Sequence, residues 1–126
     1  MSSNKQRPVN LNLPSFKFPP MALVSISHRI SGFFLYLALP WVLYLFSQLA
    51  STPNHLHALQ VLVSHFWARL LNWLVVIAAA HHIVAGTRHL IMDMGWGESL
   101  RASKISAIGV LVILFVIVIL TGVWIW

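Results

Sequence analysis

Two histidines, a glycine and an aspartate recur on one face of an apolar stretch in the second half of the sequence. His82, Gly86, His89 and Asp93 stand at i, i+4, i+7 and i+11, so in an α-helix they form one stripe. A neutral imidazole in hydrocarbon is costly without a partner, which makes such a histidine a functional candidate. Iron is one such partner, and Gly86 would leave a notch for a flat macrocycle. The stripe therefore predicts His82 as an axial ligand of a haem iron.

The same residues allow other interpretations. His81 points about 100° away from His82 on a helix, so the two cannot face one cofactor, and Gly86 favours His82. His89 lies about two turns nearer the end of the stretch, which would bring an iron close to the lipid headgroups. Alternatively, the histidines hydrogen-bond to neighbouring helices and Gly86 allows close helix packing. A haem would also need a second axial ligand, which we expect from another chain.

A second polar group lies at the start of the first apolar stretch. Ser25, Arg29 and Gly32 stand at i, i+4 and i+7, so a hydroxyl, a guanidinium and a notch share one face. A quinone needs hydrogen-bond donors at its carbonyl oxygens and protons when it is reduced, and this group could supply both. Arg29 and protonated His28 could instead pair with carboxylates such as haem propionates. The simpler alternative is a helix cap at Ser25 and lipid-phosphate contacts by His28 and Arg29.

Three long uncharged stretches must position these groups. Residues Ile30–Ala50, Leu70–Thr87 and Ile105–Trp126 contain no Asp, Glu, Lys or Arg, and each approaches the ~20 residues that cross a bilayer. In lipid every backbone N–H and C=O must be paired within the segment, so such runs form helices. We predict an all-α, integral membrane three-helix bundle with spans at roughly 25–50, 66–92 and 104–126. Residues 21–126 form this single domain, and the polar segment 1–20 precedes it.

The composition supports this interpretation and excludes several function classes. Hydrophobic residues make up 59% of the 126 residues, and eight Lys and Arg face only two Asp and Glu, for a net charge of +6. These cations flank apolar blocks instead of forming a patch, which argues against nucleic-acid binding. The chain has no cysteine, so a disulfide, an iron–sulfur cluster, a zinc–thiolate site and a covalently attached haem are excluded within it.

The basic residues also predict an orientation. The segment that ends at Arg29 contains four Lys or Arg, and the segment from Arg88 to Lys104 contains three. The connection 51–64 has none. The N-terminus is therefore expected on the cytoplasmic side, or on the matrix side in a mitochondrion. Pro40 is expected to kink the first helix. The outer connection carries His55, His57 and nearby His65, which we expect to be solvated because no carboxylate accompanies them.

Three segments together resemble a known family. They are residues 7–13 (RPVNLNL), residues 25–32 (SISHRISG) and residues 82–90 (HIVAGTRHL). In this order they are similar to the cytochrome b membrane-anchor subunit of succinate dehydrogenase, respiratory complex II. The resemblance covers nearly the whole chain, and its two helix motifs, S-x-x-H-R-x-S-G and H-x-x-x-G-x-R-H, fall on the expected helices.

The resemblance implies a specific function and set of sites. It implies His82 as an axial ligand of haem b, with the other axial histidine supplied by a second three-helix anchor subunit. It implies a ubiquinone site at Ser25 and Arg29, and the expected cofactor-binding residues are His28, Arg29, Gly86 and His89. It also implies docking of the N-terminal segment on the iron–sulfur and flavoprotein subunits.

The resemblance also implies a location in a membrane and leaves two alternative functions. Lipid and the partner subunits surround the bundle, in a bacterial inner membrane in preference to a mitochondrial one. No catalytic residue for succinate oxidation is expected in this chain. An anchor of a menaquinol fumarate reductase and a cofactor-free membrane scaffold are the alternatives.

Overall fold

The computed structural model describes residues 18–51 and 55–126, which form four helices. They are α1 (Pro20–Ser51), α2 (His55–Ser64), α3 (Phe66–Asp93) and α4 (Leu100–Ile125). The segment 1–20, predicted to dock on peripheral subunits, lies almost entirely outside the described residues. Three of the helices, α1, α3 and α4, are long and apolar enough to cross a membrane. The predicted all-α bundle with three spanning helices is confirmed.

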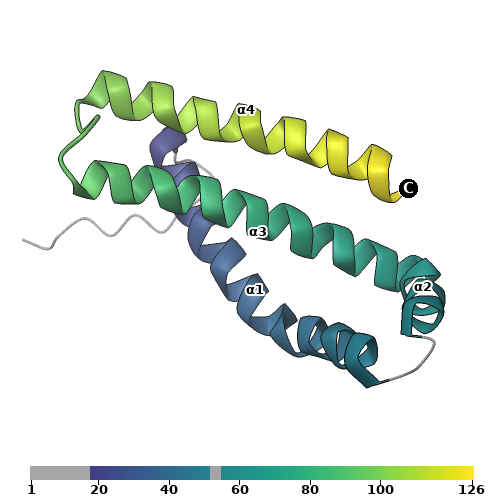
Figure 1. Cartoon of the computed structure of the whole chain (residues 1–126). Coiled ribbons are helices and arrows are strands. Elements are labelled where there is room, and N and C mark those ends of the chain that lie inside the picture. Colours follow the sequence, from purple (N-terminus) through teal and green to yellow (C-terminus); the bar gives the residue numbers. More distant parts are fainter. Residues whose placement is uncertain (1–17, 52–54) are drawn as a thin grey trace, which may run out of the picture.

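Helices α1 and α4 both pack against α3. Helices α3 and α4 run side by side in opposite directions, and α1 crosses α3 obliquely (Figure 1). Helix α1 changes direction in the half that contains Pro40, as expected where a proline removes a backbone donor (Figure 1). Helix α3 therefore contacts both other spans, and any site between α1 and α3 depends on the residues that face each other there.

The helix boundaries follow from local sequence. Pro20 occupies the first position of α1, where its missing N–H is not needed. Helix α3 ends at Asp93, and Gly95 and Gly97 follow with φ angles of 84° and 77°, a backbone region open to glycine. Ser99 then caps α4 by accepting a hydrogen bond from the backbone N–H of Ala102 at 3.3 Å.

The outer connection contains a helix that was not predicted. The sequence predicts a loop over residues 51–64, but His55–Ser64 form α2, which packs against both α1 and α3. Its sequence after His55 is rich in Leu, Ala and Val and has no glycine or proline, so nothing in it interrupts a helix. His57 and His65 are exposed, in agreement with the prediction that they are solvated.

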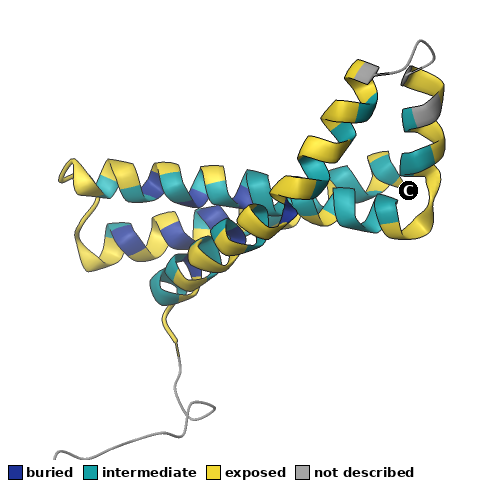
Figure 2. Ribbon diagram, turned by 90° about the horizontal axis from the view of Figure 1, so that it is seen from below, coloured by how far each residue is buried: buried dark blue, intermediate teal, exposed yellow. Residues whose placement is uncertain are grey.

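Buried residues are few and concentrate at one end of the bundle. Dark-blue segments gather toward the end that holds the α3–α4 connection (Figure 2). Within the described part of the chain, four of the buried side chains are polar: Ser31, His81, Arg88 and Ser103. Most large apolar side chains instead point outward. Such a surface requires lipid or partner proteins around it.

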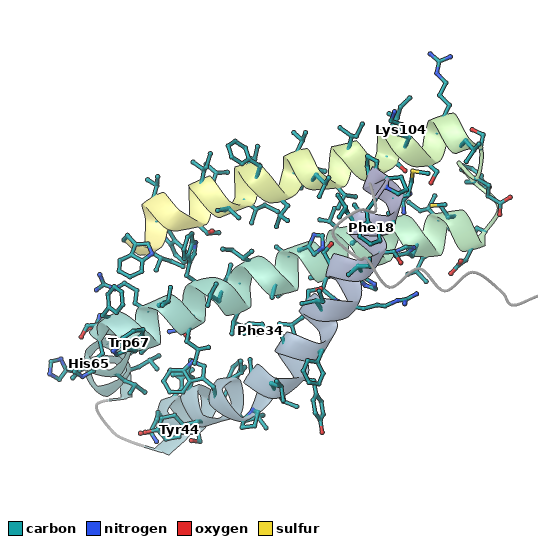
Figure 3. All side chains as sticks on the ribbon, turned by 180° about the vertical axis from the view of Figure 1, so that it is seen from behind. Phe18, Phe34, Tyr44, His65, Trp67 and Lys104 are labelled. Atoms are coloured by element: carbon teal, nitrogen blue, oxygen red, sulfur yellow. The ribbon has the colours of Figure 1, made fainter. Side chains whose placement is uncertain are left out.

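The opposite end is aromatic. Tyr44, His65 and Trp67 lie at the end of the bundle away from Lys104, which extends outward from the start of α4 (Figure 3). Two tryptophans there join helices through their indole N–H groups. Trp41 donates to Asn72 Oδ1 at 2.8 Å and Trp73 donates to Thr121 Oγ1 at 3.0 Å. Aromatic residues whose polar group can form hydrogen bonds suit a membrane interface.

The bond between Trp73 and Thr121 can be tested with Thr121→Val, which keeps the shape of the side chain. The assembled complex should lose about 0.6 kcal/mol of stability, a typical value for a hydrogen bond between membrane helices. Thermal unfolding in detergent measures the difference. Thr87→Val is the matched control, because the exposed Thr87 hydroxyl donates only to Ile83 O in its own helix. Equal melting temperatures for the two variants would refute a role for this bond.

Candidate functional site

The imidazole of His82 is held by α1 through one of its two nitrogens. His82 Nδ1 lies 3.1 Å from the backbone oxygen of His28 and 3.1 Å from Ser31 Oγ. Ser31 Oγ in turn donates to the His28 backbone oxygen at 2.7 Å. Because a carbonyl oxygen only accepts, this geometry favours a proton on Nδ1 and leaves the lone pair on Nε2. Within residues 18–51 and 55–126, no hydrogen bond involves His82 Nε2.

Two glycines make room for histidine side chains where α1 and α3 meet. A Cβ atom at Gly32 would lie 2.9 Å from Cε1 of His82, and a Cβ atom at Gly86 would lie 3.1 Å from Nε2 of His28. Each histidine therefore packs over a glycine of the other helix. The rings of His28 and His82 stack with centroids 4.1 Å apart and an angle of 18° between their planes. Stacking covers the face of the His82 ring and leaves its in-plane lone pair available.

His28 lies between two other imidazoles. Its ring centroid is 5.3 Å from that of His89, at an angle of 47°. His82, His28 and His89 thus form a row across the α1–α3 contact, which brings together three of the predicted cofactor-binding residues. The prediction that a macrocycle lies against Gly86 stays a prediction. Such a group would have to share the notch with the His28 ring, which covers Gly86 here.

His81 faces a different direction from His82, as helix geometry predicted. It is only 4% exposed, and its Nε2 lies 2.8 Å from Ser27 Oγ. Its Nδ1 is buried and has no hydrogen-bond partner among the residues that the structure describes. His81 therefore joins α3 to α1 inside the bundle, whereas His82 has a nitrogen free for a ligand. This difference supports the choice of His82 over its neighbour.

Ser25 and Arg29 lie on one flank of the α1 face that packs on α3. At 100° per residue, both flank the positions of His28 and Gly32. Ser25 is half-buried and Arg29 is exposed. Neither side chain makes a hydrogen bond to another described residue. Both polar groups therefore remain available to a ligand at the rim of the histidine row.

The donor set fits one half of a haem site. Among the described residues, no three His, Cys, Asp or Glu side chains gather into a metal-binding group. A haem iron bound by one histidine from each of two chains needs no such group. The chain supplies one imidazole with its Nδ1 held by a carbonyl oxygen, the usual arrangement of a metal-bound histidine. The residues present fit this role.

The structure also assigns contacts that sequence reasoning did not. Ser31 and Ser27 hold His82 and His81, yet only Ser25 of this serine-rich segment was singled out. Gly32 was expected to share a face with Arg29, and its place beneath His82 was not foreseen. A signal was available, because Ser27 and Ser31 are small residues at i and i+4 and Gly32 stands at i+4 from His28. Small residues at such spacing mark close contacts between membrane helices.

Comparisons with known proteins identify relatives of this chain. A protein-family profile described as succinate dehydrogenase/fumarate reductase transmembrane subunit matches residues 3–121. The succinate dehydrogenase cytochrome b556 subunit of Coxiella burnetii (strain RSA 493 / Nine Mile phase I) is 47% identical over 124 residues. That alignment covers 98% of this chain and 99% of the relative. The similarity thus extends through both helices that carry the histidines.

Substituting Gly32 by alanine tests the seat of His82. The added methyl group would meet the ring at 2.9 Å, so we expect the imidazole to move and the complex to lose about 1–3 kcal/mol, the usual cost of overpacking. The His82 ring ¹⁵N chemical shifts and the thermal unfolding midpoint report the two effects. Gly109→Ala is the control, because nothing lies within 4 Å of an added Cβ there. Unchanged His82 shifts in Gly32→Ala would contradict the packing described above.

Proposed function

The chain belongs to the family of succinate dehydrogenase/fumarate reductase transmembrane subunits, and we propose that it is the cytochrome b anchor of a succinate:quinone oxidoreductase. In this role it helps to bind haem b and ubiquinone at the membrane end of the complex. The observation that carries the proposal is the seat of His82. Its Nδ1 is held by the His28 carbonyl oxygen, so its Nε2 is directed to a ligand.

Each residue of the histidine row has a role in this proposal. His82 is the axial ligand supplied by this chain, and Ser31 fixes its tautomer and ring orientation. When bound, the haem iron would accept and release one electron. His28 and Arg29 would pair with the carboxylates of a bound haem, and His89 lies beside His28. The name of the Coxiella burnetii relative, a cytochrome b556, supports the choice of haem.

The partners follow from what the chain lacks. It has one well-seated axial imidazole, so a second anchor subunit provides the other. It has no cysteine, so the iron–sulfur cluster that delivers electrons belongs to another subunit, as does the flavin that oxidises succinate. The N-terminal segment 1–20 would dock on those peripheral subunits.

The quinone site is proposed at the rim of the row. Ser25 and Arg29 place a hydroxyl and a guanidinium beside the aqueous end of α1, where neither is committed to another described residue. Both groups can donate hydrogen bonds to quinone carbonyl oxygens, and the positive charge of Arg29 stabilises negative charge that develops there on reduction. The two protons would come from the water at this end.

The orientation is proposed from charge. Arg29, Arg101 and Lys104 are exposed at the end of the bundle that holds the histidine row. At the aromatic end, the only Lys or Arg among the described residues is Arg69, which lies 5.7 Å from the Trp126 ring. Cytoplasmic ends of membrane proteins are the basic ones. The histidine row would therefore face the cytoplasm of a bacterium, in its inner membrane.

One alternative has direct support, since the family description names fumarate reductase alongside succinate dehydrogenase. The same donors could serve menaquinol oxidation. Comparing succinate–ubiquinone and menaquinol–fumarate activities of the purified complex separates the two directions. A scaffold without cofactor would show no haem absorption.

The haem ligand is tested with His82→Ala. The purified complex should lose the Soret and α bands of a bis-histidine haem b, because one axial ligand is gone. His81→Phe is the control for registration, since His81 packs inside the bundle and would not ligate. Absorption spectra of dithionite-reduced complexes measure both. If His82→Ala kept the haem bands and His81→Phe lost them, His81 would be the axial ligand instead of His82.

The quinone site is tested with Arg29→Leu. Loss of a charged hydrogen bond predicts roughly tenfold to a hundredfold slower succinate–ubiquinone reductase activity. Succinate oxidation with an artificial acceptor should stay unchanged, because it does not need this chain. Arg101→Leu, which removes another exposed cation from the same end, should have little effect. Equal loss of both activities in Arg29→Leu would exclude the proposed site.

A further inference from the structure

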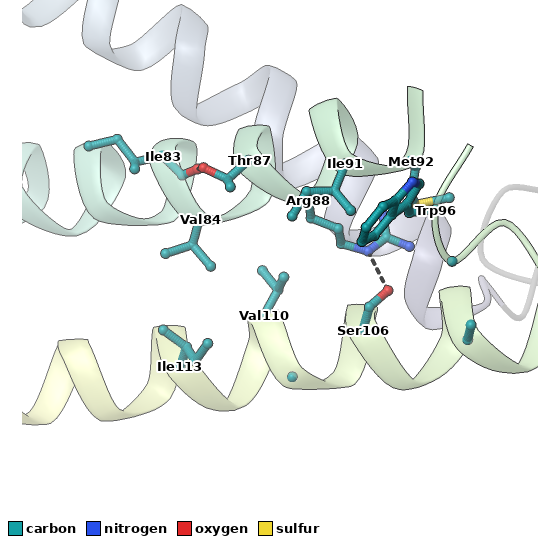
Figure 4. A pocket seen from close by; sticks show the side chains of 13 residues that line it. Ile83, Val84, Thr87, Arg88, Ile91, Met92, Trp96, Ser106, Val110 and Ile113 are labelled. Atoms are coloured by element: carbon teal, nitrogen blue, oxygen red, sulfur yellow. Dashed lines mark hydrogen bonds between the residues drawn. The ribbon is translucent and has the colours of Figure 1, made fainter. Parts of the chain in front are cut away.

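A groove runs between α3 and α4 on a side of α3 that the histidine row does not use. Its volume is about 540 Å³, and most of its lining is apolar, including Ile83, Val84, Val110 and Ile113 (Figure 4). Arg88 stands six positions after His82, so the two side chains leave α3 about 120° apart. The groove is therefore separate from the proposed haem and quinone sites.

Arg88 places a buried cation in this groove. It was expected to be one of the charges that flank the second span, but it is only 7% exposed. Its guanidinium donates to Ser106 Oγ at 2.9 Å (Figure 4). It also donates to Ser103 Oγ and to the Ser103 backbone oxygen at 2.9 and 3.0 Å. The serines of α4 turn the side chain inward, which explains the difference.

All these acceptors are neutral. Within the described ranges, no carboxylate lies in ion-pair contact with Arg88. Serine and carbonyl oxygens satisfy hydrogen bonds but leave the positive charge without a counterion, and a buried charge is costly unless it is paired. A binding partner that carries a negative charge would therefore gain from this position.

The position along the helix indicates the kind of anion. Arg88 lies about one and a half turns before the end of α3 at Asp93, a depth near the boundary between headgroups and hydrocarbon. Trp96, an interfacial residue type, also lines the groove beside Arg88 (Figure 4). From there the apolar lining continues toward the middle of the span. A ligand with a negative headgroup and a hydrocarbon tail matches both parts.

We infer that this groove binds one anionic phospholipid, with its phosphate at Arg88 and an acyl chain along Ile83, Val84 and Ile113. The exposed cations Arg101 and Lys104 at the start of α4 add attraction for a negatively charged headgroup. A helix of a partner subunit would need a carboxylate at this depth to compensate Arg88, and such residues are rare in membrane helices. Lipid is therefore favoured as the occupant.

The decisive variant fills the groove without touching Arg88. Gly109 lines the groove and has nothing within 4 Å of an added Cβ, so Gly109→Leu occupies the space of the acyl chain. The control is Val112→Phe, because Val112 is 57% exposed and lies outside the groove lining. The assembled complex is exchanged into detergent with increasing phosphatidylglycerol or phosphatidylcholine, and native mass spectrometry counts the retained lipids.

The parent complex and Val112→Phe should retain one more phosphatidylglycerol than Gly109→Leu. Arg88→Gln should bind this lipid about fivefold more weakly and Arg88→Lys should largely retain it, as expected for the loss or preservation of one positive charge near a headgroup. Unchanged haem spectra in Gly109→Leu would show that the complex is assembled. Equal retention in the parent and Gly109→Leu, or no preference over phosphatidylcholine, would overturn the inference.

A cross-link identifies the occupant directly. This chain has no native cysteine, so Gly109→Cys can be labelled in it with a photoreactive maleimide. Illumination of the complex in vesicles that contain phosphatidylglycerol should attach lipid to this chain. A cross-link to another subunit instead would show that protein covers the groove and would refute lipid binding there.

Discussion

The close approach of α1 and α3 at Gly32 and Gly86 is the constraint on which the rest of the site depends. Each glycine provides the space that the other helix fills with an imidazole, so neither position accepts a side chain without moving a ring. This packing puts the rings of His28 and His82 in contact and turns His82 Nδ1 to the backbone of α1. One packing contact thus sets both the distance between the helices and the direction of the available nitrogen.

This contact also explains why polar residues gather at one end of an otherwise apolar bundle. In hydrocarbon a polar side chain must find its partner inside the protein. His81 meets Ser27, His82 meets Ser31 and Arg88 meets Ser103, each across a helix–helix contact. At the other end, indole N–H groups make the equivalent links. The spans are therefore joined by a few hydrogen bonds and small-residue contacts, with little buried apolar volume.

Much of this fold could be predicted from the sequence, because the bilayer fixes span length and the glycines fix the break after Asp93. The stripe of His82, Gly86 and His89 was also visible, since it follows from helical periodicity alone. What could not be predicted depends on the neighbour across a contact. The packing of His82 over Gly32 depends on which residues of α1 lie opposite α3, and the inward turn of Arg88 depends on which residues of α4 do. Periodicity within one helix does not contain that information. Helix α2 was missed because a short segment between two membrane spans looks like a loop when its packing on α1 and α3 is unknown.

Several polar groups of this chain are available to partners, and they lie on different surfaces. Within the described residues, the available groups include one lone pair on His82, the uncommitted donors of Ser25 and Arg29, and the unpaired charge of Arg88. Each lies on a different surface: the α1–α3 contact, the flank of α1, and the α3–α4 groove. A single partner cannot reach all three. Groups so placed are expected in a subunit that forms one wall of several shared sites, where haem, quinone, lipid and neighbouring subunits each complete a different face. The small buried core fits the proposed assembly, in which lipid and partner subunits would cover most of the surface of this chain.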